Sequence, residues 1–292
     1  MTFNDNARID TGKVQRRRGG RVAAIGGGGA LVVIAVALLS QFLGVDLTPI
    51  AQTVGLGGQS SSEQIAPLEN CETGADANAN DECRMAAAAD SLDVFWADQF
   101  ESGYRAPGVI LYSGSTDSAC GTASAAIGPF YCPSDESIYL DTAFFATLRS
   151  DFGATAGPLA QMYVLAHEWG HHVSNLTGDM QRADRGSGPA SGSVRLELQA
   201  DCYAGAWVGE ASTVTDANGQ AFMRPVTADE IADAMNAAAS IGDDYIQQRS
   251  GGQVNPEGFT HGTSEQRQRW FQTGYREGVA ACGTFDVSAG SL

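Results

Sequence analysis

Residues 165–172 read Leu-Ala-His-Glu-Trp-Gly-His-His and contain the pattern H-E-x-x-H. Residues four apart lie on one face of a helix, so His167 and His171 can present two imidazoles to a single metal ion. Glu168 projects about 100° around the helix from His167. Its carboxylate is therefore beside the ion, where it can accept a proton from water. The stretch predicts a helix that carries two metal ligands and a general base.

A second helical segment supplies a third ligand. Residues 195–202 read Arg-Leu-Glu-Leu-Gln-Ala-Asp-Cys. Glu197 can complete a His2Glu donor set and leave the fourth position of a tetrahedral zinc ion for water. Asp201 follows one turn later on the same face, where it can accept a hydrogen bond from a ligand imidazole and fix its tautomer. An H-E-x-x-H pattern alone can arise by chance, but the two segments together predict a Zn²⁺ centre held by His167, His171 and Glu197.

Four segments of the chain, in this order, resemble one family of proteins. They are Gly-Pro-Phe-Tyr-Cys-Pro at 128–133, the H-E-W-G-H-H run at 167–172, L-E-L-Q-A-D-C-Y-A-G at 196–205 and His-Gly-Thr-Ser at 261–264. They resemble the neutral zinc metallopeptidases, which belong to the gluzincin type of zinc peptidase with a helical glutamate as third ligand. The resemblance runs from about Cys71 to Cys282 and extends to a basic, Gly-rich amino terminus before an apolar segment. It implies a zincin-like fold and peptide hydrolysis, and little about the substrate.

Charge is distributed unevenly along the chain. The first 21 residues hold six basic and two acidic residues. The whole chain has 17 basic and 34 acidic residues, so residues 22–292 hold 11 basic and 32 acidic residues and are strongly acidic. Phosphate binding needs clustered Lys and Arg, and we therefore expect no nucleic acid as a partner of the main domain.

The chain has no charged residue between Arg21 and Asp46. Such a stretch, as a helix, is long enough to cross about 30 Å of hydrocarbon, and we predict a single transmembrane helix at 22–44. A cleaved signal peptide is the rival interpretation, but the Ala-x-Ala sites lie within the apolar core rather than after it. Arginines before the helix and none soon after it predict a cytoplasmic amino terminus.

All six cysteines follow this apolar stretch, on the side predicted to be exported. An even number of cysteines in an oxidising compartment predicts disulfides, although six cysteines allow about 15 connectivities. The spacings favour Cys71–Cys83 and Cys120–Cys132 as local links and leave Cys202–Cys282. A second metal site is the alternative, but the chain has no C-x-x-C pair.

The chain divides into four predicted parts. Residues 1–21 form a disordered, basic cytoplasmic tail, 22–44 the transmembrane helix, 45–69 a Gly- and Ser-rich linker and 70–292 one zinc metallopeptidase domain. The domain is of the α+β class, predominantly helical, with a small edge sheet. The protein would be a single-pass protein of the cell membrane, with its catalytic domain in the periplasm or outside the cell.

Apolar periodicity and capping residues place the elements of this domain. We expect helices at 85–100, 159–173, 227–248 and 263–281, and strands at 108–112 and 137–140. Thr177-Gly178 offers an end for the motif helix. The second strand could be the edge that aligns a peptide substrate by main-chain pairing, and the Gly-rich loop at 185–193 could be a lid or a connector.

Outside the metal centre, His261 is the main chemical candidate. It lies in a loop before a capped helix, where it can either donate to the oxyanion of the reaction or secure the helix entry. His172 points about 100° away from His171 and is expected to make a structural hydrogen bond. Tyr131, Tyr139 and Tyr203 are further oxyanion donors that the sequence does not rank.

These features predict a membrane-anchored zinc metallopeptidase that acts on a peptide or protein substrate, with Glu168 as general base. A non-catalytic, zinc-stabilised extracytoplasmic binding module is the alternative, but a structural site has no use for Glu168. An intramembrane protease would need its motif within a spanning helix, and polar residues surround this one. The sequence does not indicate the oligomeric state.

Overall fold

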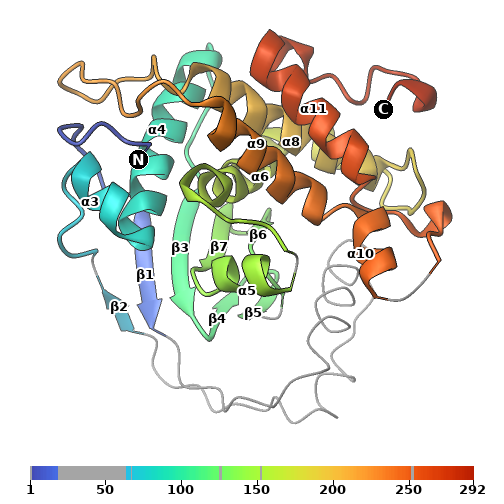
Figure 1. The fold of residues 1–292 in the computed structure, drawn as a ribbon, viewed down its shortest axis with the longest axis horizontal. Helices are drawn as coiled ribbons and strands as arrows, with labels where there is room; N and C mark the ends of the chain where they lie inside the picture. The colour runs from blue at the N-terminus through green and yellow to red at the C-terminus, as the bar shows by residue number, and fades with distance from the viewer. Residues whose placement is uncertain (1, 19–63, 67, 125–126, 152, 251–252) are drawn as a thin grey trace.

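The structure is a computed structural model, and it describes residues 2–18, 64–66, 68–124, 127–151, 153–250 and 253–292. Figure 1 shows a sheet on one side of the view and most of the long helices on the other. This mixed helical and sheet architecture agrees with the predicted α+β class.

The main sheet has five strands. In sheet order they are β2 Gln64–Ala66, β1 Val14–Arg18, β3 Gly108–Ser113, β7 Ser137–Asp141 and β6 Phe130–Cys132. The inner strands β1, β3 and β7 run parallel, and the outer strands pair antiparallel with their neighbours. The middle of β3 is buried and apolar, as expected for a parallel strand covered on both faces. A separate hairpin follows β3, with strands β4 Ser115–Ser118 and β5 Gly121–Ser124.

The helices gather around the motif helix α6, Pro158–Thr177. The others are α3 Gly74–Ala79, α4 Asp81–Gln99, α5 Phe144–Ser150, α7 Asp179–Arg182, α8 Gly192–Glu210, α9 Ala228–Ser240, α10 Asp243–Arg249 and α11 Ser264–Glu277. Within the described residues there are also three short 3-10 turns: η1 Pro256–Gly258 between α10 and α11, and η2 Val279–Ala281 and η3 Ala289–Ser291 after α11. Helix α6 contacts the sheet through β6 and β7 and contacts α4, α8 and α9 (Figure 1).

Helix α6 begins and ends where its sequence predicts. Pro158 occupies the first turn, where its missing N–H costs nothing. Gly178 ends the helix in the left-handed conformation, with φ 86°. Within the helix, Gly170 allows α8 to cross closely, because a Cβ there would lie 2.8 Å from Ala200 Cα. The crossing brings the two predicted ligand helices together.

Two predicted helices differ from the structure. The helix expected at 227–248 begins with the predicted capping box at Thr227 but divides into α9 and α10. The break lies at Gly242, where a Cβ would be 2.5 Å from the backbone nitrogen of Ser264 at the start of α11. The last helix ends at Glu277 rather than 281, because Gly278 adopts φ 77°.

The prediction that residues 1–21 are disordered is wrong for residues 2–18. Strand β1 lies inside the sheet, parallel to β3 from Val14↔Val109 to Arg18↔Ser113. Phe3 is fully buried in the core. The segment was missed because its arginines hide a strand pattern, and its pairing partner lies some 95 residues later in the chain.

The prediction that strand 137–140 forms the edge is also wrong. Strand β7 is an inner strand, and β6 covers its outer side. A three-residue strand gives too short a pattern to be recognised in the sequence.

The predicted transmembrane helix at 22–44 lies outside the described residues, as does most of the predicted linker at 45–69. Among the helices that the structure does describe, none is both long enough and apolar enough to cross a membrane.

The six cysteines pair as the spacings predict. Cys71–Cys83 joins the segment before α3 to α4, and Cys120–Cys132 joins the hairpin to β6. Cys202–Cys282 joins α8 to the segment after α11.

Candidate metal centre

His167, His171 and Glu197 come together at the crossing of α6 and α8. Glu197 Oε2 lies 3.2 Å from His167 Nε2, and Glu197 Oε1 lies 3.4 Å from His171 Nε2. The three potential ligand atoms lie within 4.8 Å of one another, and all three residues are buried. Burial acts to raise the pKa of Glu197, but the two imidazoles outweigh it and hold that pKa well below its usual value. Glu197 is therefore an ionised carboxylate aimed at two imidazole nitrogens.

Glu168 lines the same cavity as the three candidate ligands and is buried. The backbone N–H of Tyr131, on the edge strand β6, acts to lower the pKa of Glu168. Burial raises the pKa of Glu168, against the opposing effect of His167 and His171. A carboxylate with a raised pKa is a better proton acceptor than an ordinary one.

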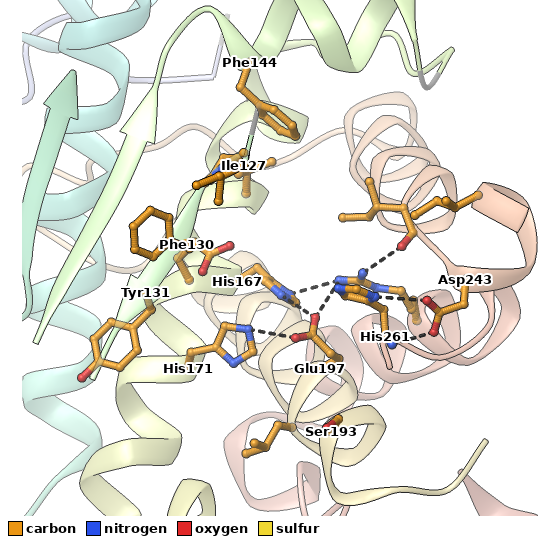
Figure 2. Close-up of a pocket in the computed structure, with 18 of the residues that line it drawn as sticks. Ile127, Phe130, Tyr131, Phe144, His167, His171, Ser193, Glu197, Asp243 and His261 are labelled. Carbon is orange, nitrogen blue, oxygen red and sulfur yellow. Dashed lines mark hydrogen bonds and ion pairs between the residues drawn. The ribbon is translucent and has the colours of Figure 1, made fainter. Parts of the chain in front are cut away.

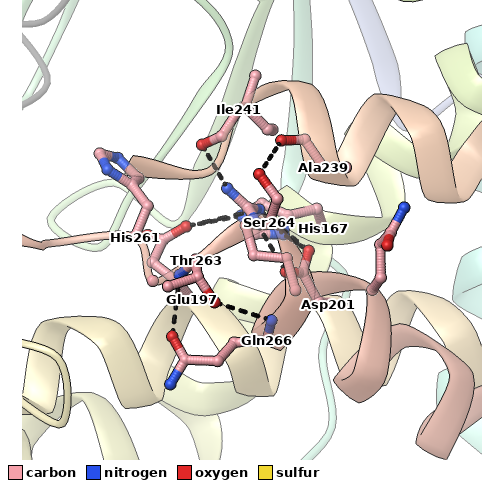
Figure 3. A network of polar contacts seen from close by, with 12 residues as sticks. His167, Glu197, Asp201, Ala239, Ile241, His261, Thr263, Ser264 and Gln266 are labelled. Atoms are coloured by element: carbon pink, nitrogen blue, oxygen red, sulfur yellow. Dashed lines mark hydrogen bonds and ion pairs between the residues drawn. The ribbon is translucent and has the colours of Figure 1, made fainter. Parts of the chain in front are cut away.

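A network of buried charged side chains contacts the Nδ1 side of the His167 ring (Figure 3). Asp201 Oδ1 lies 2.8 Å from His167 Nδ1, and Arg267 Nε donates to Asp201 Oδ2 at 2.8 Å. The Tyr163 hydroxyl also donates to Asp201. Burial acts to raise the pKa of Asp201, but Arg267 and His167 hold it below its usual value. The ionised carboxylate can accept from Nδ1–H, which would leave Nε2, on the side of Glu197, free to ligate a metal ion.

His261 is held by a second buried carboxylate, that of Asp243 at the start of α10. Asp243 Oδ1 lies 3.1 Å from His261 Nδ1. Asp243 Oδ2 accepts from the backbone N–H groups of Thr260, His261 and Gly262 at 2.7, 2.6 and 2.9 Å. Burial acts to lower the pKa of His261, but Asp243 and Glu197 outweigh it and raise that pKa. Because Nδ1 faces Asp243, Nε2 is the nitrogen left to face the cavity.

A cavity of about 430 Å³ opens in front of these residues. It reaches His167, Glu168, His171, Glu197 and His261 (Figure 2). Residues 128–131 line another wall, so the edge strand β6 borders it. A cavity of this size is typical of a ligand-binding site.

The family model described as "Putative neutral zinc metallopeptidase" matches residues 3–285. The chain belongs to this family. It is 46% identical over 294 residues to the uncharacterized protein Rv2575 of Mycobacterium tuberculosis (strain ATCC 25618 / H37Rv), covering 99% of each chain. It is also 36% identical over 269 residues to the uncharacterized protein YpfJ of Escherichia coli (strain K12), covering 88% of this chain and 86% of that one. No solved structure matches the chain.

The donor set of this family member fits a metal such as zinc. Two imidazole nitrogens and one carboxylate are ligands that zinc prefers in catalytic sites. Ligand atoms about 2.0–2.1 Å from a tetrahedral ion lie roughly 3.3 Å apart. Glu197 lies near that distance from each imidazole, at 3.2 Å through Oε2 and at 3.4 Å through Oε1, and the three potential ligand atoms together lie within 4.8 Å of one another.

The structure shows which of the other predicted oxyanion donors, and which remaining histidine, lie at the cavity. His172 is fully buried and bonds the Tyr131 hydroxyl and the Arg105 carbonyl, at 3.0 and 2.7 Å, so it has the expected structural contacts. Figure 2 shows the Tyr131 hydroxyl pointing away from His171. Tyr139 donates to Asp135, and neither it nor Tyr203 lines the cavity. Of the four predicted oxyanion donors, His261 is therefore the one whose donor group is available to the cavity.

Sequence reasoning missed Arg267 and Asp243. Arg267 lies on the same face of α11 as Trp270, Phe271 and Gly274, all of them buried. A charge on an apolar face is a signal that could have identified it. Asp243 carried no such signal, because its role depends on a loop 17 to 19 residues later.

Proposed function

We propose that the protein is a zinc-dependent peptidase. The observation that carries this proposal is the position of Glu168, which is buried in the same cavity as the His-His-Glu cluster. A non-catalytic zinc module needs neither this carboxylate nor an open cavity before its metal. The family description points the same way.

Each residue of the site has its own proposed role in peptide hydrolysis. When bound, zinc would polarise the scissile carbonyl and lower the pKa of a water molecule to about 7. Glu168 accepts the proton of that water at its carboxylate and delivers it to the leaving nitrogen. Asp201 keeps the proton of His167 on Nδ1, with Arg267 holding Asp201 in place.

His261 is the proposed donor to the oxyanion. Asp243 fixes its ring through Nδ1 and three backbone N–H groups, so Nε2 is presented to the cavity without further reorganisation. Pre-oriented donors of this kind stabilise the charge that develops on the substrate oxygen.

The substrate is proposed to bind as an extended peptide beside β6. Among the described strands β6 pairs with β7 alone, and its residues border the cavity. A peptide can therefore add to this edge through main-chain hydrogen bonds.

We also propose that the domain is exported. The three disulfides use all six cysteines of the chain and are typical of an oxidising compartment. An association of residues 22–44 with a membrane is proposed from the sequence. A single crossing there would separate β1 from β2, which pair with each other, so the proposal is limited to an association that leaves both strands on one side.

Two substitutions separate the ligand from the base. Glu197→Ala should lose most of the zinc. Glu168→Gln should keep the zinc and lower kcat on a peptide substrate by about 10²–10⁴-fold. Zinc content by elemental analysis and turnover on the same preparations measure both effects. Glu210→Gln, an exposed residue at the end of α8, is the matched control and should change neither. Full zinc content in Glu197→Ala would refute the proposed third ligand, and unchanged turnover in Glu168→Gln would refute the base.

A separate variant tests His261. His261→Ala should lower kcat by about 100-fold or more with zinc content unchanged, because the lost bond forms only in the transition state. Normal turnover with a lowered melting temperature would instead assign His261 to the helix entry.

A further inference from the structure

Strand β1 ties the first residues of the chain into the middle of the main sheet. It lies between β2 and β3 (Figure 1). It pairs antiparallel with β2 and parallel with β3, and the β3 register runs from Val14↔Val109 to Arg18↔Ser113. Main-chain hydrogen bonds to later segments therefore hold β1 on both of its edges.

The segment before β1 is bound to the domain as well. The side chain of Asn4 donates to the carbonyl oxygens of Ala221 and Met223, at 2.8 and 3.1 Å. The backbone N–H of Arg8 donates to Asp216 at 2.7 Å. These partners lie 208 to 219 positions apart in the sequence, so the first residues are part of the tertiary structure and not an appendage to it.

Two basic residues of this segment have acidic partners on helix α4. Lys13 Nζ lies 3.0 Å from Asp93 and 3.4 Å from Asp90. Arg16 Nε lies 3.2 Å from Glu82. Basic residues that orient a membrane protein act on the cytoplasmic side of the membrane. Here the two positive charges are instead paired with carboxylates of the domain itself.

From these contacts we infer that residues 2–18 lie on the same side of any membrane as the rest of the domain. A membrane between β1 and its neighbours would break the main-chain hydrogen bonds of an inner strand and both sets of ion pairs. The arrangement that the arginines predict, with a cytoplasmic tail and an exported domain, would require this separation. If the domain is exported, as proposed above, residues 2–18 are exported with it.

Cysteine labelling of the full chain in bacterial spheroplasts, whose cytoplasmic membrane is intact, tests the inference. Asn6→Cys marks the first segment and Gln253→Cys marks the domain, and both positions are exposed. Ala217→Cys, also exposed, is a second marker of the domain in case the Gln253 variant misfolds. A membrane-impermeant maleimide should label the two segments alike before lysis, and it should label both after lysis.

The possible outcomes separate this inference from the proposal of export. Labelling of both segments before lysis supports the two together. Labelling of neither segment before lysis supports the inference and contradicts export. Labelling of one segment before lysis, with the other labelled only after lysis, would overturn the inference.

A second inference rests on an independent observation, the contact between helix α6 and the edge strand β6. His172 is fully buried, and its Nε2 lies 2.7 Å from the carbonyl oxygen of Arg105. Because a carbonyl oxygen only accepts, Nε2 carries the proton and Nδ1 of the neutral ring is an acceptor. The Tyr131 hydroxyl, 3.0 Å from Nδ1, donates to it and accepts from Asn175 Nδ2 at 3.0 Å. Two residues of α6, about one turn apart, thus bind one hydroxyl group of β6.

Tyr131 connects this contact to the candidate metal centre. Its hydroxyl points away from His171 (Figure 2), whereas its backbone N–H acts on Glu168 and lowers the pKa of that carboxyl. Tyr131 also lines the cavity. Strand β6 has three residues and, among the described strands, pairs with β7 alone. A strand this short depends on side-chain contacts to keep its position.

We propose that His172 and Asn175 are positioning residues, which hold β6 at Tyr131 and so keep the edge strand beside Glu168. This inference rests on the peptidase function proposed above. A displacement of about 1 Å at a reacting site can lower the rate by about 100-fold. The contact therefore affects turnover even though neither residue reaches the cavity.

Tyr131→Phe tests the proposal, because it removes the hydroxyl and keeps the ring. On a mixture of unstructured peptides, the zinc-loaded variant should have a kcat lower by about 10–100-fold, with zinc content unchanged. The loss should be in kcat and not only in KM, because Glu168 acts in the chemical step. Tyr139→Phe is the matched control. Its hydroxyl donates to Asp135 at 2.9 Å and lies outside the cavity, so its loss should leave kcat unchanged.

Asn175→Ala removes the other partner of the hydroxyl and should lower kcat in the same direction. Wild-type kcat in both Tyr131→Phe and Asn175→Ala, with lowered melting temperatures, would assign the contact to stability alone and leave the peptidase function standing. Cleavage of no peptide by the zinc-loaded wild type would instead refute the peptidase function.

Discussion

Asp201 shows how much the site depends on one residue. Its side chain is fully buried and accepts from Arg267, Tyr163 and His167. Arg267 is itself only 1% exposed. Each of the two charges is therefore tolerated in the interior because the other lies beside it. The same carboxylate orients a candidate ligand, so stability and metal binding depend on one group.

Asp201→Asn should weaken both properties. Removal of this partner leaves the buried Arg267 charge with only the more distant Glu197 carboxylate, at 3.9 Å, which should lower the free energy of unfolding by about 3–5 kcal/mol. The loss of the carboxylate behind His167 should weaken zinc binding by about 10–100-fold. Denaturant unfolding and chelator competition measure the two effects. Asp98→Asn, at an exposed position on α4, is the control and should stay within about 0.5 kcal/mol of wild type. Similar behaviour of the two variants would contradict the role of Asp201.

Asp243 should contribute stability that depends on pH. Burial acts to raise its pKa, but His261 and the backbone N–H groups outweigh it, so the folded pKa lies below the usual value. The contribution of such a group is complete above the unfolded pKa of about 3.9 and is lost as pH falls through the folded pKa. At pH 6, Asp243→Asn should therefore be less stable than wild type by about 1–3 kcal/mol. The gap should narrow at pH 3. Denaturant titrations of chelator-treated proteins measure it, and a gap of equal size at both pH values would rule out this linkage.

At the scale of helices, glycines decide how closely α8 and α11 approach. A Cβ on Gly274 would lie 1.8 Å from the carbonyl oxygen of Cys202, and one on Gly205 would lie 2.0 Å from that of Phe271. Each glycine thus admits the backbone of the other helix. The contact positions Arg267 of α11 beside Asp201 of α8. The Cys202–Cys282 disulfide fixes the same pair of segments covalently.

Gly274→Ala should destabilise the protein, contrary to the usual effect of this change in a helix. Alanine in a helix interior normally stabilises by about 1 kcal/mol relative to glycine. Here the added methyl group collides with backbone, and overpacking of this kind costs about 1–3 kcal/mol or more. Thermal unfolding shows whether the substitution lowers or raises the melting temperature. Gly290→Ala, with no atom within 4 Å of the added carbon, is the control and should leave the melting temperature nearly unchanged. A higher melting temperature for Gly274→Ala would show that the helices do not approach as described.

At the scale of the whole molecule, the integrity of the domain depends on residues 2–18, which pack against segments from much later in the chain. Residues from the beginning of the chain complete a sheet whose other strands come from later positions, and Phe3 reaches the common core. The domain therefore includes residues on both sides of 19–63. A fragment that starts after this stretch would lack an inner strand of the sheet.

Phe3→Ala should measure this docking directly. Phe3 is fully buried, and truncation of a buried phenylalanine costs about 3–5 kcal/mol. Val254, which is 39% exposed, offers the control, and Val254→Ala should cost less than about 0.5 kcal/mol. Chemical denaturation of the full chain provides both values. Equal stabilities of the two variants would mean that the first residues do not belong to the core.

The sequence by itself determined the local features of this protein. The i, i+4 spacing of His167 and His171, the helix end at Gly178 and the capping box at Thr227 depend on geometry within a few residues. The spacings favoured the three disulfide pairs but left the connectivity open, and the structure joins them in that way. Glu197 was found because its own helix carries a recognisable pattern.

The tertiary structure alone decided which distant segments meet. The placement of β1 next to β3 and the break at Gly242 each depend on a partner far away in the chain. The pairing of Arg267 with Asp201 spans 66 residues. A local pattern specifies how a segment folds and which face it buries. Which distant segment covers that face is decided by the packing of the whole core. Several faces of the chain have a similar local pattern, and only the arrangement that buries all of them together selects one partner for each.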